Sequence, residues 1–178
     1  MRQSLRPRMT AIAPSAAEAV QYAGGWLFDQ AMAGWDVTVL TVDDGDPRPL
    51  DILGVRARTF DAVFPAPVLG RCLQAIALRT DLYHDDERVR RLVLAAAEAG
   101  RAEIRLWGEV SLWDEIRPAD FDGSGDPVSH RLSLAARAFK AQALAAADLR
   151  GAPTTETEVF RRVELRRPRL TAVSLQNV

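Results

Sequence analysis

The sequence predicts one α/β domain, a Rossmann-like three-layer sandwich in which helices cover both faces of a mostly parallel sheet. Short apolar or β-branched runs alternate along the chain with longer segments of helical period. The run Val37–Val42 is apolar on both faces, as is typical of a strand buried between two helical layers. The 178 residues, 48% of them hydrophobic, are enough for one continuous core and too few for two.

The first three elements form a βαβ unit. A short apolar strand is expected at Thr10–Ala13, followed by a helix over Ser15–Met32 that Gly34 ends and a second strand at Val37–Val42. The helix is indicated by apolar residues at helical spacing, namely Ala19, Val20, Ala23, Leu27, Ala31 and Met32. A helical crossover predicts that the two strands lie parallel.

The rest of the chain continues this alternation. Strands are expected at Cys72–Leu78 and Glu103–Val110, with an amphipathic helix at Asp85–Gly100 between them. A loop rich in Gly, Asp and Pro, Arg117–Val128, then leads to a long alanine-rich helix, Ser129–Leu149. All four strands are expected to be parallel neighbours, because each connection is long enough for a crossover.

Composition limits the classes of partner and the cellular compartment that are expected for this protein. A formal charge of −1 and a pI near 6.1 provide no field that would attract nucleic acid or an anionic membrane. The chain has no apolar run of about eighteen residues and no apolar signal core, so a cytoplasmic protein is expected. We expect a single domain over residues 1–178, with a flexible leader at 1–8 and a tail segment at 165–178.

One stretch, Met9–Gly45, carries a family resemblance. It contains a short strand, a loop with Pro14, and a helix bearing a Gly-Gly pair. This order resembles the start of the LmbE-like (PIG-L) family of zinc-dependent N-deacetylases, in which the strand ends in Pro-His-Pro-Asp-Asp-Glu and Gly-Gly follows. Without a gap, the family's metal-binding His falls on Ser15, its catalytic Asp on Ala17, its metal-binding Asp on Glu18, and its glycines on Gly24 and Gly25.

A second match lies near the predicted long helix. The family's His-Pro-Asp-His falls on Pro127 to His130, so only the last His is retained, and the resemblance implies that it stands at the head of the Ser129–Leu149 helix. Lys140–Leu144 and Thr157–Arg161 are similar to two later family segments. The resemblance covers about residues 9 to 164.

The matched residues are a poor set for zinc chemistry. A catalytic zinc takes three protein ligands and leaves one position for water. The resemblance supplies Ser15, Glu18 and His130, and a neutral serine hydroxyl is a poor zinc ligand. Ala17 has no group that accepts a proton from water. We therefore predict no metal site, no cofactor and no zinc-dependent hydrolysis of the family type.

Several residues are candidates for a site without metal. We expect His130 and Glu18 to face one crevice, where a carboxylate would orient the imidazole as a general acid or base. The candidate ligand-binding residues are Ser15, Asp44, Arg58, Asp81 and Ser129. Asp44 follows a strand whose carboxyl end borders the expected crevice, while Arg58 and Asp81 match positions around the family's substrate pocket.

Structural roles compete with each of these functional ones. Ser15 and Glu18 have the spacing of a capping box, which alone explains both residues. His130 fits equally well as a residue that hydrogen-bonds the preceding loop. A solvated turn accounts for Asp44, and surface ion pairs account for Arg58 and Asp81.

Three classes of function remain open. The first is a non-catalytic protein that binds a small polar ligand, a partner protein or a second copy of itself in the crevice. The second is a metal-independent biosynthetic enzyme that uses His130 and a carboxylate. The third is an N-deacetylase with a rebuilt metal site.

Overall fold

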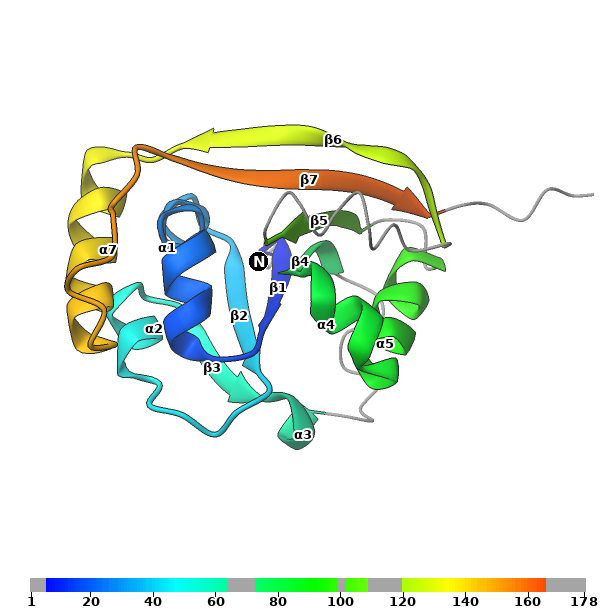
Figure 1. Cartoon of the computed structure of the whole chain (residues 1–178), viewed down its shortest axis with the longest axis horizontal. Coiled ribbons are helices and arrows are strands. Elements are labelled where there is room, and N and C mark those ends of the chain that lie inside the picture. The colour runs from blue at the N-terminus through cyan, green and yellow to red at the C-terminus, as the bar shows by residue number, and fades with distance from the viewer. Residues whose placement is uncertain (1–5, 64–72, 99–101, 109–119, 166–178) are drawn as a thin grey trace, which may run out of the picture.

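A computed structural model describes residues 6–63, 73–98, 102–108 and 120–165 of the chain. Its centre is a seven-stranded sheet with the strand order β3-β2-β1-β4-β5-β7-β6 (Figure 1). The strands are β1 Arg8–Ala13, β2 Asp36–Thr41, β3 Arg56–Thr59, β4 Leu73–Arg79, β5 Glu103–Trp107, β6 Phe121–Arg131 and β7 Thr157–Leu165. The helices are α1 Ala16–Met32, α2 Arg48–Ile52, α3 Phe60–Val63, α4 Thr80–Asp85, α5 Glu87–Glu98 and α7 Leu134–Ala146. Within the described ranges, no helix has the length and apolar character needed to cross a bilayer.

The first five strands are parallel, as the sequence predicts. β1 lies between β2 and β4 and pairs with both in parallel, while β3 and β5 extend the parallel sheet at its two sides. The predicted neighbours are therefore confirmed, because each connection along this part of the chain is a crossover. The predicted start at Cys72 and end at Val110 lie outside the described residues. Of the predicted leader and tail, Arg8 already begins β1 and Leu165 ends β7, while residues 1–5 and 166–178 are outside the described ranges.

The end of the chain differs from the prediction. The segment predicted as a loop and a helix start forms β6, which pairs antiparallel with β7 from Arg131↔Thr157 to Val128↔Phe160. The helix that follows is shorter than Ser129–Leu149, because Ser133 caps it by accepting a hydrogen bond from the Ala136 N–H at 3.0 Å. Gly, Asp and Pro in β6 suggested a loop, whereas cross-strand pairing with β7 stabilises an extended strand.

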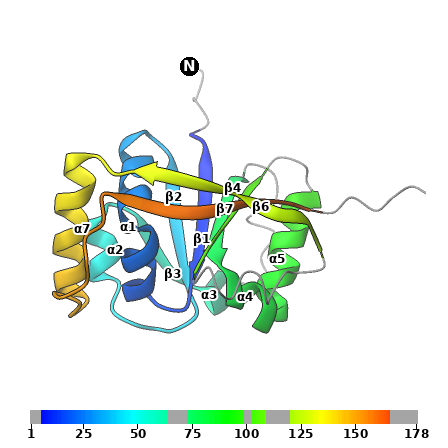
Figure 2. The same ribbon diagram turned by 45° about the horizontal axis from the view of Figure 1, so that its top comes forward.

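Two cores pack on opposite faces of the sheet, which confirms the three-layer fold. Ala11 and Val39 face α1 and α7, while their strand neighbours Ile12 and Leu40 face the layer that contains α4 and α5. The two helical layers lie on either side of β1 and β4, and the antiparallel pair of β6 and β7, which are joined through α7, extends beyond the parallel strands toward α7 (Figure 2). This overhang brings the junction of β6 and α7 against α1.

The Gly-Gly pair in α1 permits that contact. A Cβ atom at Gly25 would lie 2.4 Å from the Leu132 side chain, which is closer than real side chains approach. At Gly24 the nearest atoms would be at 3.3 Å, on Val20, and 3.4 Å, on Leu53. Gly25 is therefore the glycine that the packing of α1 against the β6–α7 junction requires.

Candidate functional site

The loop after β1 and the first turn of α1 lie at the carboxyl end of the parallel strands, where open α/β sheets form their ligand sites. Ser15 caps α1, since its Oγ accepts a hydrogen bond from the Glu18 N–H at 3.1 Å. The N-cap role of Ser15 is therefore confirmed, but the reciprocal half of the capping box is not formed, because Glu18 Oε2 contacts Arg79 and Glu18 Oε1 has no hydrogen-bond partner among the described residues.

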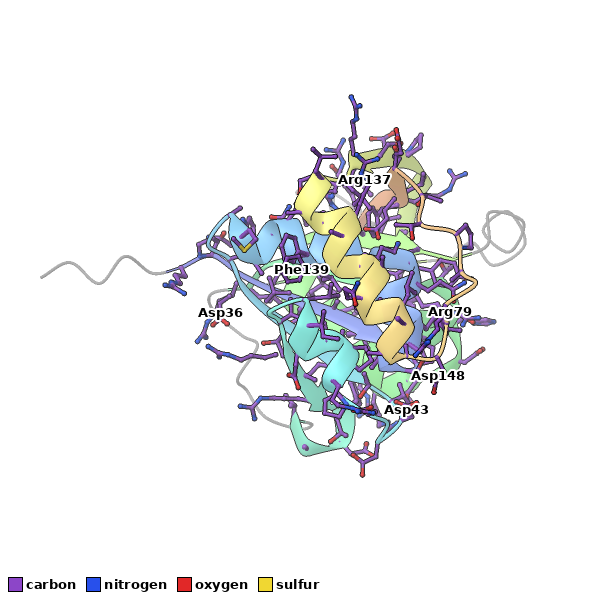
Figure 3. The ribbon with its side chains drawn as sticks, turned by 90° about the vertical axis from the view of Figure 1, so that its left-hand side faces the viewer. Asp36, Asp43, Arg79, Arg137, Phe139 and Asp148 are labelled. Carbon is purple, nitrogen blue, oxygen red and sulfur yellow. The ribbon has the colours of Figure 1, made fainter. Side chains whose placement is uncertain are left out.

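A cavity of about 190 Å³ lies beside this first turn. It is bounded by the start of α1, the loop between β2 and α2, the start of α2 and the end of α7, and Asp43 and Asp148 come from two of these elements (Figure 3). Its lining consists of Ser15, Ala16, Ala17, Asp43, Gly45, Asp46, Arg48, Pro49, Ala146, Ala147 and Asp148. The cavity therefore includes Ser15 and Ala17, the positions matched to the metal-binding His and the catalytic Asp.

Acidic groups dominate the polar lining of the cavity. Asp46 pairs with Arg48 at 2.6 Å, and the hydrogen bond from this guanidinium holds the pKa of Asp46 below its ordinary value. Asp43 and Asp148 have no side-chain hydrogen bond within the described part of the chain, although the pKa of Arg48, raised mainly by its hydrogen bond to Asp46, is also raised by the charge of Asp148. Asp148 also adopts a left-handed backbone conformation, with φ at 59°, which is uncommon for a residue other than glycine. The open groups of the cavity are thus mainly hydrogen-bond acceptors.

Glu18 faces a different neighbour, Arg79 at the end of β4. The Arg79 Nη1 atom lies 2.6 Å from Glu18 Oε2, and its Nε atom lies 2.6 Å from Asp81 Oδ1 in the first turn of α4. Partial burial lowers the pKa of Arg79, but the hydrogen bond to Glu18 and the charges of both carboxylates outweigh it and raise the pKa. Glu18 and Asp81 are therefore brought together, through a cation that the sequence interpretation missed.

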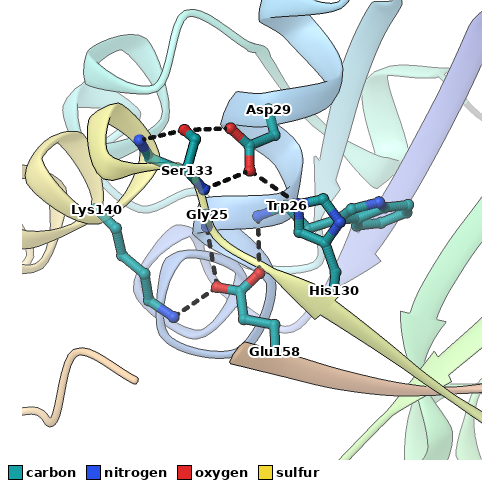
Figure 4. A network of polar contacts seen from close by, with 8 residues as sticks. Gly25, Trp26, Asp29, His130, Ser133, Lys140 and Glu158 are labelled. Atoms are coloured by element: carbon teal, nitrogen blue, oxygen red, sulfur yellow. Dashed lines mark hydrogen bonds and ion pairs between the residues drawn. The ribbon is translucent and has the colours of Figure 1, made fainter. Parts of the chain in front are cut away.

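His130 lies elsewhere, so the predicted pair with Glu18 is wrong. His130 is in β6, and its Nε2 atom is 2.8 Å from Asp29 Oδ2 near the last turn of α1 (Figure 4). Asp29 lies eleven positions after Glu18 in α1, which is about 16 Å at 1.5 Å per residue. The physical reason is the β6 strand, which places His130 at the opposite end of α1 from the site.

Asp29 is the centre of a structural cluster. It accepts hydrogen bonds from the Ser133 Oγ–H at 2.6 Å and from the Ser133 N–H at 3.2 Å, in addition to its contact with His130. Burial raises the pKa of Asp29, but the hydrogen bonds from Ser133 and His130 outweigh it and lower the pKa. The cluster fastens the start of α7 to the end of α1.

A buried ion pair anchors the middle of α1. The Lys140 Nζ atom donates to Glu158 Oε1 at 2.6 Å (Figure 4). It also donates to the Gln21 carbonyl at 2.8 Å. Glu158 also accepts hydrogen bonds from the Gly25 N–H at 2.9 Å and the Trp26 N–H at 2.8 Å. The two side chains are 1% and 2% exposed, so the pair holds α1, α7 and β7 together from inside. The later motif matches at Lys140 and Glu158 therefore have a structural explanation.

The remaining predicted residues do not converge on the cavity. Asp44 is exposed in the loop next to the cavity residues Asp43 and Gly45. Arg58 is exposed on β3 in register with Leu40, which faces the α5 layer, so Arg58 is on the opposite side of the sheet from α1. Ser129 is exposed in β6 opposite Val159 and does not begin a helix.

The site residues do not fit a zinc ion. Ser15 Oγ serves as a helix cap, Glu18 Oε2 is held by a guanidinium, and His130 is bound to Asp29 about three turns of helix away. In the ranges that the structure describes, His, Cys, Asp and Glu form no group of three suited to hold a metal ion. Zinc would need ligands that converge on one point.

Comparison with known proteins identifies the fold. By sequence, no family model and no curated protein matches this chain. By structure, it is similar to a teicoplanin deacetylase solved in complex with teicoplanin, with a TM-score of 0.62 and 17% identity over 90% of this chain and 100% of that one. It is also similar to Dbv21, the A40926 pseudoaglycone deacetylase, with a TM-score of 0.60 and 19% identity over 91% of this chain and 98% of that one.

A third solved structure adds a different reaction. GalB from Pseudomonas putida, a 4-carboxy-2-hydroxymuconate hydratase, has a TM-score of 0.51 and 13% identity over 96% of this chain and 99% of its own. One fold thus accommodates deacetylases and a hydratase, and the reaction must be argued from the site. The two deacetylases are LmbE-like proteins, and this chain shares their LmbE-like α/β fold, as its first motif predicts.

Proposed function

We propose that this chain binds a small polar ligand in the cavity at the N-terminal end of α1, without zinc-dependent hydrolysis of the LmbE-like type. The observation that carries the proposal is the cavity itself, which is lined by Ser15 and Ala17 from the first motif. Its volume of about 190 Å³ is smaller than that of typical drug-sized pockets, which favours a compact ligand. Alanine at position 17 cannot activate water, which supports binding over hydrolysis.

The lining favours a ligand with hydrogen-bond donors. Asp43 and Asp148 offer carboxylates without a hydrogen bond among the described residues, and the one arginine of the lining, Arg48, is paired with Asp46 and interacts only through its charge with Asp148. An ammonium or amino group would give each open carboxylate a charge-assisted hydrogen bond. We therefore expect small amines and amino alcohols to bind more tightly than neutral polyols, and carboxylic acids to bind least.

Calorimetric titration with a panel of small amines, polyols and carboxylic acids tests the proposal. Ala17→Leu fills the cavity from the first turn of α1 and is expected to abolish binding of the best amine. Ala135→Leu adds the same atoms at an exposed position of α7 that does not line the cavity, and it should bind like the wild type. Equal affinity in Ala17→Leu would contradict the proposal.

A second variant tests the preference for a cation. Asp148→Asn removes the charge and keeps a residue that tolerates the left-handed backbone. The amine should then bind about five-fold more weakly, because a hydrogen bond to a charged group is stronger by roughly 1 kcal/mol. Binding of a neutral polyol should change less. Equal losses for both ligands would argue against charge recognition.

A further inference from the structure

The carboxyl end of β4 carries an arginine that contacts two acids from different helices. Arg79 extends from the sheet on the side of α1, since Ala75 and Ala77 of the same strand face that core. Glu18 reaches it from the first turn of α1 and Asp81 from the first turn of α4. The three side chains are 32%, 16% and 27% exposed, so solvent screens them less than ordinary surface pairs.

We infer that Arg79 is the resident cation of this end of the sheet, and that its guanidinium holds the carboxylate which the LmbE-like motif would offer to a metal ion. Glu18 stands at the position matched to a metal-binding Asp, and its Oε2 atom is occupied by Arg79. A divalent cation at the same carboxylate would be repelled by the guanidinium charge. The positive charge beside Glu18 is thus supplied by the Arg79 side chain and not by a bound metal ion.

Arg79 leaves one carboxylate oxygen of Glu18 without a hydrogen bond in the part of the chain that the structure describes. Glu18 Oε1 is buried and has no hydrogen-bond partner within the described residues. Removal of the guanidinium would therefore leave Glu18 with two free oxygens and Asp81 without its cation. Carboxylate oxygens suit ions such as Mn²⁺, which accept oxygen ligands and keep several bound waters. Loss of Arg79 is expected to convert a site closed to divalent cations into one that accepts them.

The inference is independent of the proposed ligand. Arg79, Glu18 and Asp81 do not line the cavity, which lies beside the first turn of α1 between α2 and α7. Failure of every amine to bind in the cavity would leave the role of Arg79 unaffected, and a metal titration tests that role alone.

Mn²⁺ titration followed by the electron paramagnetic resonance signal of the free ion provides the test. Wild-type protein and Arg79→Lys, which keeps a cation, should show only weak, unsaturable binding. Arg79→Met and Arg79→Gln should both bind Mn²⁺ at least about ten-fold more tightly than the wild type. Circular dichroism establishes that each variant is folded, and Arg79→Gln keeps amide donors for the two acids if Arg79→Met is too unstable.

Two controls make the outcome specific. Adding Glu18→Gln to Arg79→Met should return Mn²⁺ binding to the wild-type level. Arg88→Met removes another arginine that bridges two acids, Asp61 and Asp86, and should gain much less because Asp61 is 76% exposed. The inference is overturned by wild-type Mn²⁺ binding that Glu18→Gln abolishes, by folded Arg79 variants that gain nothing, or by an equal gain in Arg88→Met.

Discussion

The two ends of α1 use polar side chains in opposite ways. At the middle and C-terminal end, Asp29, Lys140 and Glu158 each have two or more partners that the chain itself provides. At the N-terminal end, the cavity residues Asp43 and Asp148 keep carboxylate oxygens without hydrogen bonds among the described residues. Polar groups satisfied by the protein fix its structure, whereas open groups beside a cavity are available to a ligand.

The largest loss of stability is expected from removal of the buried ion pair between Lys140 and Glu158. Lys140→Met leaves Glu158 buried and charged without its cation, and removal of one partner of such a pair costs about 3–5 kcal/mol. Urea unfolding should show this loss in the free energy of unfolding. Arg137→Met is the control on the same helix, because its pair with Glu156 is solvent-exposed and contributes at most about 1 kcal/mol. Similar losses in the two variants would contradict the structural role of the buried pair.

A smaller loss should come from the Gly-Gly pair. Gly25→Ala forces a Cβ atom against Leu132 and is expected to destabilise by about 1–3 kcal/mol, as over-packing does. Gly24→Ala meets only Val20 and Leu53 at van der Waals contact or slightly closer, and alanine favours a helix over glycine by up to about 1 kcal/mol. The two variants should thus differ in thermal midpoint, with Gly24→Ala close to the wild type. The reverse order would mean that Leu132 does not pack on Gly25.

The N-cap residues of α1 and α7, Ser15 and Ser133, differ in the number of hydrogen bonds they make. Ser15→Ala removes one side-chain hydrogen bond, to the Glu18 N–H, and should cost about 1 kcal/mol. Ser133→Ala removes a cap and also the hydrogen bond to Asp29, so it should cost more, up to about 2 kcal/mol. Chemical denaturation of both variants measures the difference. A larger loss for Ser15→Ala would show that the N-terminal end also fixes the fold.

The smallest effect is a dependence on pH. The pKa of Asp29 in the folded protein is below its ordinary value of 3.8, so its ionised form contributes stability above that pH. This contribution is lost as the pH falls below 3.8 through the folded pKa. The difference in unfolding free energy between wild type and Asp29→Asn should therefore shrink as the pH falls below 3.8. A difference that grows as the pH falls would contradict the cluster around Asp29.

The sequence predicts the parallel half of the fold and the cap at Ser15, because period and spacing are local signals. It does not predict the partner of His130, since the β6–β7 pairing depends on contacts between strands far apart in the chain. The same limit applies to Arg79. The sequence places Arg79 directly after a predicted strand, as it places Asp44. The contacts of Arg79 with Glu18 and Asp81 follow only from the fold. Arg58 lies on a short edge strand, and its neighbours in sequence do not determine on which side of the sheet its side chain lies. Only the pairing of β3 with β2 places Arg58 on the side opposite α1.

On the proposed assignment, the N-terminal end of α1 binds a ligand while the other end fixes the structure. Titration of ¹⁵N-labelled protein with the best-binding small amine, followed by amide chemical shifts, tests it most directly. We expect saturable shifts at Ala17, Gly45 and Asp148, which line the cavity, and none at Gly25, Trp26 and Ser133. Shifts confined to the second group would contradict the account.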